Sequence, residues 1–375
     1  KHLIFNFKTL SRIMKHTKFF IFALVAAMTF SACGTDDSLE ITKPDQVNGG
    51  NNSGGNTGGG NTGGNTGGST GGSILGDNTP GVSTNKANQN MNMPTAIMPE
   101  VVKNAINGLE FPKIKGGSSY VVTHMADNAV NFSSEWDDNL QAQRWTCYFY
   151  CESNKGGNVG RLGDFINDPD LAKYYPGITE FASTPYQNSG YDRGHLIASH
   201  ERQASAVSNK QTFYFTNMQP QYSTFNQSKG IWFAMEQQNL KKNISGRDTL
   251  FVVKGGTIEN GNVIEYVKNR SHINPSEYVK QPHDGYIPVP KYFFVAFLEK
   301  KYNKDTDSFK YNAFGYWFLH ENKTFDSKDK LVNYIVNIKT LEDKTGIDFF
   351  CNLPDNIEQE VENKDIEAIK NHWGW

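Results

Sequence analysis

Four consecutive residues, Asp192-Arg193-Gly194-His195, place a carboxylate, a guanidinium and an imidazole around one glycine. An imidazole with a pKa near about 6.5 can take a proton from water at neutral pH. A guanidinium can hold a phosphate group through two parallel hydrogen bonds. We expect Gly194 to let the chain turn, so that the neighbouring side chains converge. Together these residue types favour phosphodiester cleavage, with His195 and Arg193 in the leading roles.

Further polar residues follow His195 at positions that suit a strand and then a helix. The stretch Thr216-Asn217-Met218-Gln219-Pro220-Gln221 precedes Phe225-Asn226, and residues 230–240 then carry apolar residues at helical spacing. An asparagine amide oxygen is a hard, neutral ligand that suits a Mg²⁺ ion retaining most of its waters. A glutamate along the helix, Glu236, can hold those waters. The alternatives are a helix N-cap at Asn226 and a solvated helix face at Glu236.

The elements that must position these residues can be predicted from apolar patterning. We expect strands at residues 119–124, 145–151, 212–215, 249–253, 292–297 and 311–319, with Gly255-Gly256 closing the fourth of them. Residues 230–240 and 355–370 favour helices, and residues 328–338 favour a mixture of helix and strand. Strands on both sides of a few helices indicate an α+β fold, with a mixed or antiparallel sheet core and flanking helices.

The beginning of the chain has the pattern of an export signal. Lys15 and Lys18 precede an apolar run from Phe19 to Phe30, which is too short to span a bilayer as a helix. The small residues Ser31-Ala32 then precede Cys33, which resembles a bacterial lipobox and predicts lipidation of Cys33. The alternative is an ordinary secretory signal with an incidental cysteine. Met14 has the position of a translation start, so residues 1–13 are interpreted as upstream translation and residues 14–33 as the signal peptide.

A glycine-, asparagine- and threonine-rich segment follows the signal peptide. We expect residues 34–92 to form a flexible tether and residues 93–375 to form one catalytic domain. No second apolar run approaches membrane length, so the mature protein is expected to be anchored to a membrane rather than threaded through it. The acidic pair Asp36-Asp37 after Cys33 is compatible with delivery to the outer membrane or the cell surface.

Charge and cysteine content narrow the function further. A formal net charge of −2 argues against a protein that coats nucleic acid by bulk electrostatics, although it is compatible with an enzyme that holds one phosphate with a metal. Apart from Cys33, the chain has Cys147, Cys151 and Cys351. Cys147 and Cys151 would lie about 13 Å apart on one strand, too far for a disulfide. Any bridge would therefore join Cys351 to one of them.

In their order along the chain, these motifs resemble those of the DNA/RNA non-specific endonuclease family, which includes mitochondrial endonuclease G. This family lies within the ββα-metal (His-Me finger) superfamily. The resemblance extends from about Tyr120 to Leu353. It is carried by Tyr191-Asp192-Arg193-Gly194-His195, by Thr216-Asn217-Met218-Gln219-Pro220-Gln221, by Phe225-Asn226, and by Trp232 with Glu236.

The resemblance implies a Mg²⁺-dependent, sugar-non-specific hydrolysis of DNA and RNA that leaves 5′-phosphate ends. It implies that His195 is the general base, that Asn226 is the only direct protein ligand of Mg²⁺ (or of Mn²⁺ or another divalent ion), and that Glu236 holds metal-bound water. Arg193 would bind phosphate, and Asp192 would organise the loop.

Two further residues are candidate substrate contacts, each with a structural alternative. Arg144 could make a second phosphate contact or be a surface charge beside Trp145. Asn217 could contact substrate or be a turn residue that supports the site. Members of the family often dimerise, and the sequence leaves a homodimer open.

Two departures from the family pattern bear on the site. His200 stands where the family usually has a small residue, and Ser228-Lys229 lengthens the connection between Asn226 and Trp232 by two residues. Two other functions compete with the leading one. They are a catalytically inactive, lipid-anchored nucleic-acid-binding module and a specific nuclease acting as an effector toxin. The intact His195, Asn226 and Glu236 argue against the first, and the tether and lipidation fit the second less well.

Overall fold

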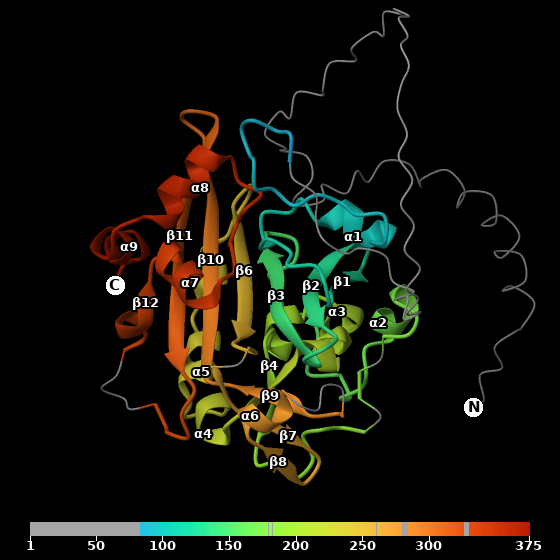
Figure 1. Ribbon diagram of the computed structural model, residues 1–375. Coiled ribbons are helices and arrows are strands. Elements are labelled where there is room, and N and C mark those ends of the chain that lie inside the picture. The colour runs from blue at the N-terminus through green and yellow to red at the C-terminus, as the bar shows by residue number, and fades with distance from the viewer. Residues whose placement is uncertain (1–82, 179, 182, 260, 280–283, 326–329) are drawn as a thin grey trace, which may run out of the picture. The chain divides into compact units, whose positions relative to one another are not determined.

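A computed structural model describes residues 83–375, apart from residues 179, 182, 260, 280–283 and 326–329. A seven-stranded antiparallel sheet, with the order β1-β2-β3-β6-β10-β11-β12, forms its centre (Figure 1). The strands are β1 (Ser119–Ala126), β2 (Ala129–Asp137), β3 (Ala142–Tyr150), β6 (Thr249–Gly256), β10 (Tyr292–Asn303), β11 (Ser308–Leu319) and β12 (Ile335–Val336). The antiparallel sheet with flanking helices confirms the α+β fold class.

Apolar side chains alternate along the central strands and give each face of the sheet its own core. Val253 and Phe294 belong to a cluster that includes residues of α1 (Glu100–Ala105), α7 (Ile338–Thr345) and α8 (Asp355–Glu362). Their neighbours Val252 and Phe293 belong to a second cluster, with residues of α4 (Ser223–Asn226), α5 (Ile231–Glu236) and α9 (Ile366–Trp373). The second face therefore carries the helices that contain Asn226 and Glu236.

Two small sheets lie together below the central sheet in the view of Figure 1. One pairs β4 (Asp192–His195) with β5 (Met218–Gln221), and the other has the order β8-β7-β9, from Ser271–Ile273, Val263–Lys268 and Ile287–Pro290. The remaining α-helices are α2 (Pro169–Tyr174), α3 (Ala206–Gln211) and α6 (Pro275–Tyr278). Single 3₁₀ turns occur at Ser199–Arg202, Phe215–Asn217, Leu240–Asn243 and Leu331–Tyr334.

The expected strand at residues 212–215 is wrong. Thr212 and Phe213 form a turn, Tyr214 makes an isolated bridge to Ile166, and Phe215 begins the 3₁₀ helix Phe215–Asn217, so the strand begins only at Met218. The short apolar run has a different cause, because Phe213 and Phe215 are buried in side-chain contacts. The other five expected strands are longer in the structure, and Gly255 and Gly256 lie inside β6 instead of following its end. A Cβ atom at Gly255 would lie 2.7 Å from the carbonyl oxygen of Arg144 on β3, so this close approach requires glycine.

The expected helices are shorter than their patterns predict. The helix at residues 230–240 ends at Glu236, and residues 355–370 form two helices, α8 and α9, instead of one. Asp365 separates them, since its carboxylate accepts hydrogen bonds from the backbone N–H groups of Glu367 and Ala368 and caps α9. Residues 331–338 contain the expected mixture of 3₁₀ helix, strand and helix start.

The last ten residues of the expected tether, 83–92, are described by the structure, and two of their side chains contact the folded domain. Asn88 and Asn92 are buried. The Asn88 amide donates to the carbonyl oxygens of Cys351 and Leu353, and that of Asn92 donates to Pro112. The Asn88 bonds satisfy backbone groups of the loop before α8, and the Asn92 bond satisfies one before β1, which explains why the polar composition did not indicate order. Most of the expected tether, and the signal segment with Cys33, lie outside the described residues.

The cysteines of the described part are all reduced and buried: Cys147, Cys151 and Cys351. Burial raises the pKa of Cys147 and Cys351 well above the usual range, so both are neutral thiols. Within the described residues, no helix is both long enough and apolar enough to cross a bilayer.

A buried histidine joins the edge strand β1 to α2. The ring of His124 is fully buried, with Nε2 3.1 Å from Asp168 Oδ2 and Nδ1 3.2 Å from Asp170 Oδ2. Burial alone would lower the pKa of His124, but the two carboxylates outweigh it and raise the pKa to about 9. The ring is therefore an imidazolium between two carboxylates at neutral pH.

We predict that His124 stabilises the fold most below pH 6.5 and that this contribution disappears as the pH rises through about 9. Its size is on the order of 3 kcal/mol, since each tenfold change in proton affinity corresponds to about 1.4 kcal/mol. Thermal unfolding of wild type and His124→Gln between pH 6 and 10 measures it. The difference in Tm should be largest at pH 6 and should shrink towards pH 10. A difference independent of pH would contradict an imidazolium at this position.

Candidate active site

One ββα unit, formed by β4, β5 and the helices α4 and α5, contains His195, Asn226 and Glu236. β4 and β5 pair antiparallel, with Asp192 opposite Gln221 and His195 opposite Met218. Side chains tie β5 to the central sheet, because Gln219 Nε2 donates to the Gln143 carbonyl and Gln143 Nε2 donates to the Met218 carbonyl, at 2.9 and 3.1 Å. These two hydrogen bonds attach the ββα unit to the central sheet.

Gly194 has a role different from the one expected. It lies inside β4, and it is not among the glycines with positive φ. A Cβ atom at this position would lie 2.2 Å from Cδ of Gln221, whose side chain crosses the strand here and is fully buried. Gly194 therefore allows close packing of the two strands and does not turn the chain.

His195 is a buried, neutral imidazole. Its side chain packs edge-on against Phe213 and Phe165, with ring centroids 5.1 and 5.7 Å away. Burial, together with the nearby charges of Arg161 and Arg193, lowers the pKa of His195 to about 3 against the opposing effect of Glu201. Within the described residues, no hydrogen bond reaches its Nε2. That nitrogen is also shielded from solvent, so among the described residues it is a buried ring nitrogen without a partner.

Two guanidinium groups cover the aromatic rings beside His195. The guanidinium of Arg193 lies 4.0 Å from the ring centre of Phe165, and that of Arg161 lies 4.6 Å from the ring centre of Phe213. Both arginines are exposed, so their N–H groups remain available to an anion. The sequence did not indicate Arg161, because it lies in an irregular loop far from the motif. Arg161 is identified as part of the site because its charge lowers the pKa of both His195 and Glu236.

Asp192 connects the strand to the helix and does not pair with Arg193. Its carboxylate accepts hydrogen bonds from Ser223 Oγ at 2.8 Å, Asn226 Nδ2 at 3.2 Å and Gln227 Nε2 at 2.9 Å. Asn226 is the last residue of α4 and is half-buried, and the N-cap of α5 is Gly230. The N-cap alternative for Asn226 is therefore wrong. Because its nitrogen faces Asp192, its amide oxygen is the atom left for a ligand.

A hollow of about 480 Å³ adjoins these groups. Asp192, Arg193 and Asn226 line it on one side, and Phe165 and Tyr191 belong to its aromatic wall. A carboxylate, a cation and an amide oxygen around one hollow give it the chemistry of a site for a phosphate and a cation together.

Glu236 is the last residue of α5. The charge of Arg161, which acts on His195, also acts on Glu236. Burial raises the pKa of Glu236 to about 8, against the opposing charges of Lys254 and Arg161. The ring of His200 lies against this helix end, with Nε2 3.2 Å from the Glu236 carbonyl oxygen. The residue that departs from the family pattern therefore supports the helix terminus.

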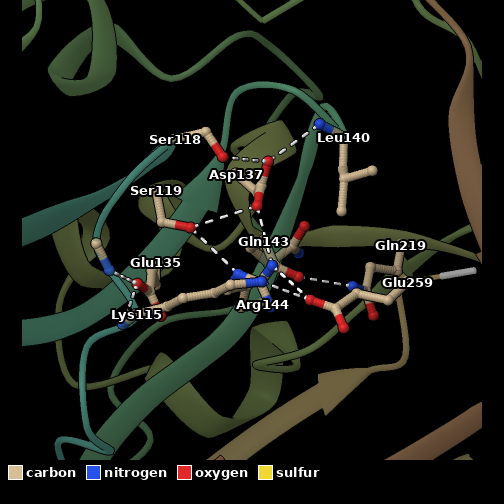
Figure 2. Close-up of polar contacts among 11 residues, drawn as sticks. Lys115, Ser118, Ser119, Glu135, Asp137, Leu140, Gln143, Arg144, Gln219 and Glu259 are labelled. Atoms are coloured by element: carbon tan, nitrogen blue, oxygen red, sulfur yellow. Dashed lines mark hydrogen bonds and ion pairs between the residues drawn. The ribbon is translucent and has the colours of Figure 1, made fainter. Parts of the chain in front are cut away.

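Asn217 and Arg144, the two candidate substrate contacts, are both engaged elsewhere. Asn217 is fully buried, and its amide exchanges hydrogen bonds with Ile197 N–H and C=O and donates to the Thr212 carbonyl. It holds the loop after His195, which corresponds to the supporting role. Figure 2 shows Arg144 donating to Ser119, Asp137 and Glu259 at 3.2, 3.1 and 2.7 Å. Its guanidinium is thus occupied by acids, which argues against a phosphate contact.

Two groups in the described residues have three metal-ligand side chains close together, and neither contains His195 or Asn226. In the first, Asp168 and Asp170 face different nitrogens of the His124 ring, so one ion cannot use the histidine with both acids in this arrangement. The second is the acidic group Glu342, Asp348 and Glu362, which lies at the helices α7 and α8.

A profile of the DNA/RNA non-specific endonuclease family matches residues 115–356, which include the whole ββα unit. The chain belongs to this family. Its relatives include a nuclease of Nostoc sp., 27% identical over 210 residues that cover 56% of this chain and 67% of the relative. Nuclease C1 of Cunninghamella echinulata is 25% identical over 190 residues, covering 50% and 67%. Human mitochondrial endonuclease G is 24% identical over 204 residues, covering 54% and 61%.

Among solved structures, a chain of the EndoG/EndoGI complex matches 65% of this chain and 91% of its own length, with a TM-score of 0.48 and 19% identity. The match to the family profile and to these nucleases confirms the resemblance that the sequence motifs indicated.

We predict that Arg161→Ala lowers kcat/KM for cleavage of DNA by about 10- to 100-fold, as expected for a lost charge-assisted hydrogen bond of roughly 1.5–3 kcal/mol. Arg161→Lys should lose less, because the charge remains. Arg247→Ala is the matched control, since Arg247 also stacks on an aromatic ring, Tyr302, but lies near the β10–β11 turn. Equal effects of Arg161→Ala and Arg247→Ala would show that Arg161 does not act at the site.

Proposed function

We propose that this protein is a Mg²⁺-dependent, sugar-non-specific endonuclease that hydrolyses phosphodiester bonds of DNA and RNA. One observation carries the proposal: a neutral, buried His195 and the free amide oxygen of Asn226 belong to the strand and the helix of one ββα unit. Membership of the family supports the same activity.

The donor set fits a hard divalent cation. Asn226 would hold Mg²⁺ through its amide oxygen, and Glu236 would hold metal-bound water. Desolvation and the charge of Glu201 raise the pKa of Glu236, which is half-buried, and a nearby dication would counter both effects. Mn²⁺ or another divalent ion could serve in place of Mg²⁺. The bound ion would contribute positive charge that stabilises the phosphate and the departing 3′ oxygen.

His195 would take a proton from the attacking water through a ring nitrogen. The ring is a weak base in the free protein, but a bound phosphodiester places an anion beside it and favours the imidazolium. Arg193 and Arg161 would hold the phosphate oxygens and replace their hydration. Water attack then breaks the bond between phosphorus and the 3′ oxygen, which leaves a 5′-phosphate end. Contacts directed at phosphates would make the enzyme tolerant of base and sugar.

Two other functions remain as competitors of this proposal. A catalytically inactive nucleic-acid-binding module would keep the fold without needing His195 as a base. A specific nuclease effector toxin would need selective contacts to its target, whereas the exposed groups around His195 are two arginines. Homodimerisation is a separate proposal, which light scattering of the purified protein would test.

We further propose that the protein is exported and anchored by a lipid on Cys33, in the outer membrane or at the cell surface. The proposal rests on the apolar run and the small residues before Cys33. Mass spectrometry of the mature amino terminus tests it. An unmodified Cys33 would leave an ordinary secretory signal.

We predict metal-dependent cleavage of plasmid DNA, single-stranded DNA and RNA by the purified protein. EDTA should abolish cleavage, and His195→Ala should lower it by about 100-fold or more, as expected for loss of a general base. Arg144→Ala is a suitable control, because Arg144 is engaged in ion pairs and should affect cleavage little. Folded protein that cuts none of the three substrates with any divalent metal would favour the inactive binding module.

A further inference from the structure

The segment that follows β11, residues 320–325, lies against α4 and the turn after it. His320 Nε2 accepts a hydrogen bond from the backbone N–H of Tyr222 at 2.9 Å. Asn322 Oδ1 accepts one from Thr224 Oγ1 at 2.8 Å. These contacts connect the end of a central strand to the helix whose last residue is Asn226.

A third contact closes the lengthened turn. The backbone N–H of Phe325 donates to the Lys229 carbonyl at 2.8 Å. Lys229 belongs to the two residues that lengthen the connection between Asn226 and Trp232, and this hydrogen bond fixes them. The turn is closed at Gly230, where a Cβ atom would lie 1.9 Å from the Phe225 carbonyl oxygen.

His320 is itself rigidly held. It is 2% exposed, its Nδ1 donates to the Pro290 carbonyl at 2.8 Å, and its ring lies among Tyr222, Phe225 and Phe293. A donor at Nδ1 and an acceptor at Nε2 define the neutral tautomer. Burial also lowers the pKa of His320 to about 4, so the ring stays neutral at neutral pH.

α4 depends on this support because it is too short to be stable by itself. It has four residues, and Tyr222 at its N-cap provides no side-chain cap. The N–H of Asn226 donates to the Tyr222 carbonyl at 2.9 Å, so Tyr222 closes the turn that presents Asn226. The two backbone groups of Tyr222 thus link His320 on one side to Asn226 on the other.

We propose that His320 is a positioning residue, which fixes Tyr222 and thereby holds the amide oxygen of Asn226 in place for a divalent cation. The metal-binding role of Asn226 is part of the proposed function, whereas the link from His320 through Tyr222 to α4 rests on the contacts above. Glu265 adds to the link, because the Tyr191 hydroxyl donates to Glu265 Oε1 at 2.6 Å and lies 3.2 Å from Tyr222 Oη, whose own O–H can donate to it.

Two substitutions at His320 separate the two hydrogen bonds of its ring. His320→Asn keeps an amide N–H near the position of Nδ1 for the Pro290 carbonyl and loses the acceptor for Tyr222. His320→Gln keeps an acceptor near the position of Nε2. Both variants lose the same ring packing, so a general loss of stability should affect them alike. Thr224→Val is an independent surface variant, which removes the contact with Asn322 and leaves the core intact.

The measurements are hydrogen exchange of peptides covering residues 221–230, Mn²⁺ binding by calorimetry, and the Mg²⁺ concentration that gives half-maximal cleavage. In His320→Asn we expect faster exchange of these peptides and metal affinity weakened about five- to tenfold. The cleavage rate at saturating Mg²⁺ should change less than the affinity. His320→Gln should retain most of the wild-type affinity, and Thr224→Val should show a smaller change in the same direction as His320→Asn.

Equal metal affinity in His320→Asn and His320→Gln would overturn the proposal, and so would exchange at residues 221–230 that remains as slow as in wild type. If the wild-type protein neither binds Mn²⁺ nor cleaves nucleic acid, the proposed function fails. Hydrogen exchange would in that case still decide whether His320 positions α4.

Discussion

The hydrogen bond from Trp232 Nε1 to the carbonyl oxygen of His195, 3.0 Å long, is the interaction on which the site depends most. It joins α5 directly to the end of β4, so His195 on the strand and Glu236 on the helix cannot move independently. Trp232 is fully buried between Phe225 and Phe293, and this packing holds the indole ring in one position. The other contacts around the site supplement this one by fixing the loop after His195 and the short helix that ends at Asn226.

A buried ion pair between Lys254 and Glu201 stabilises the loop that follows His195. Lys254 on β6 is fully buried, and its ammonium lies 2.7 Å from Glu201 Oε2. Burial would raise the pKa of Glu201, but Lys254 and hydrogen bonds lower it to about 2. Glu201 also accepts from Tyr148 Oη and from the Ala198 N–H, so its charge is compensated on several sides. Such a pair is costly to break because the remaining charge stays buried, and this cost keeps the loop after His195 in one conformation.

The sequence predicted what depends on local pattern. Long apolar runs predicted the central strands. The order of the motifs predicted the fold class, and it also predicted that His195, Asn226 and Glu236 belong to one unit. It could not predict contacts between distant segments. Arg161 and His320 have no local signal, because each acquires its role from a ring or a backbone group far along the chain. Gly194 was misinterpreted for the same reason, since the side chain of Gln221 that requires a glycine comes from the partner strand.

A crystal structure of His195→Ala with a short DNA duplex and Mg²⁺ would test the central claim most directly. The account predicts one Mg²⁺ ion with the Asn226 amide oxygen as its only protein ligand, a phosphate bridging that ion and Arg193, and residue 195 facing the phosphorus. An ion held by His124 with Asp168, or a phosphate bound away from β4 and α4, would contradict the account.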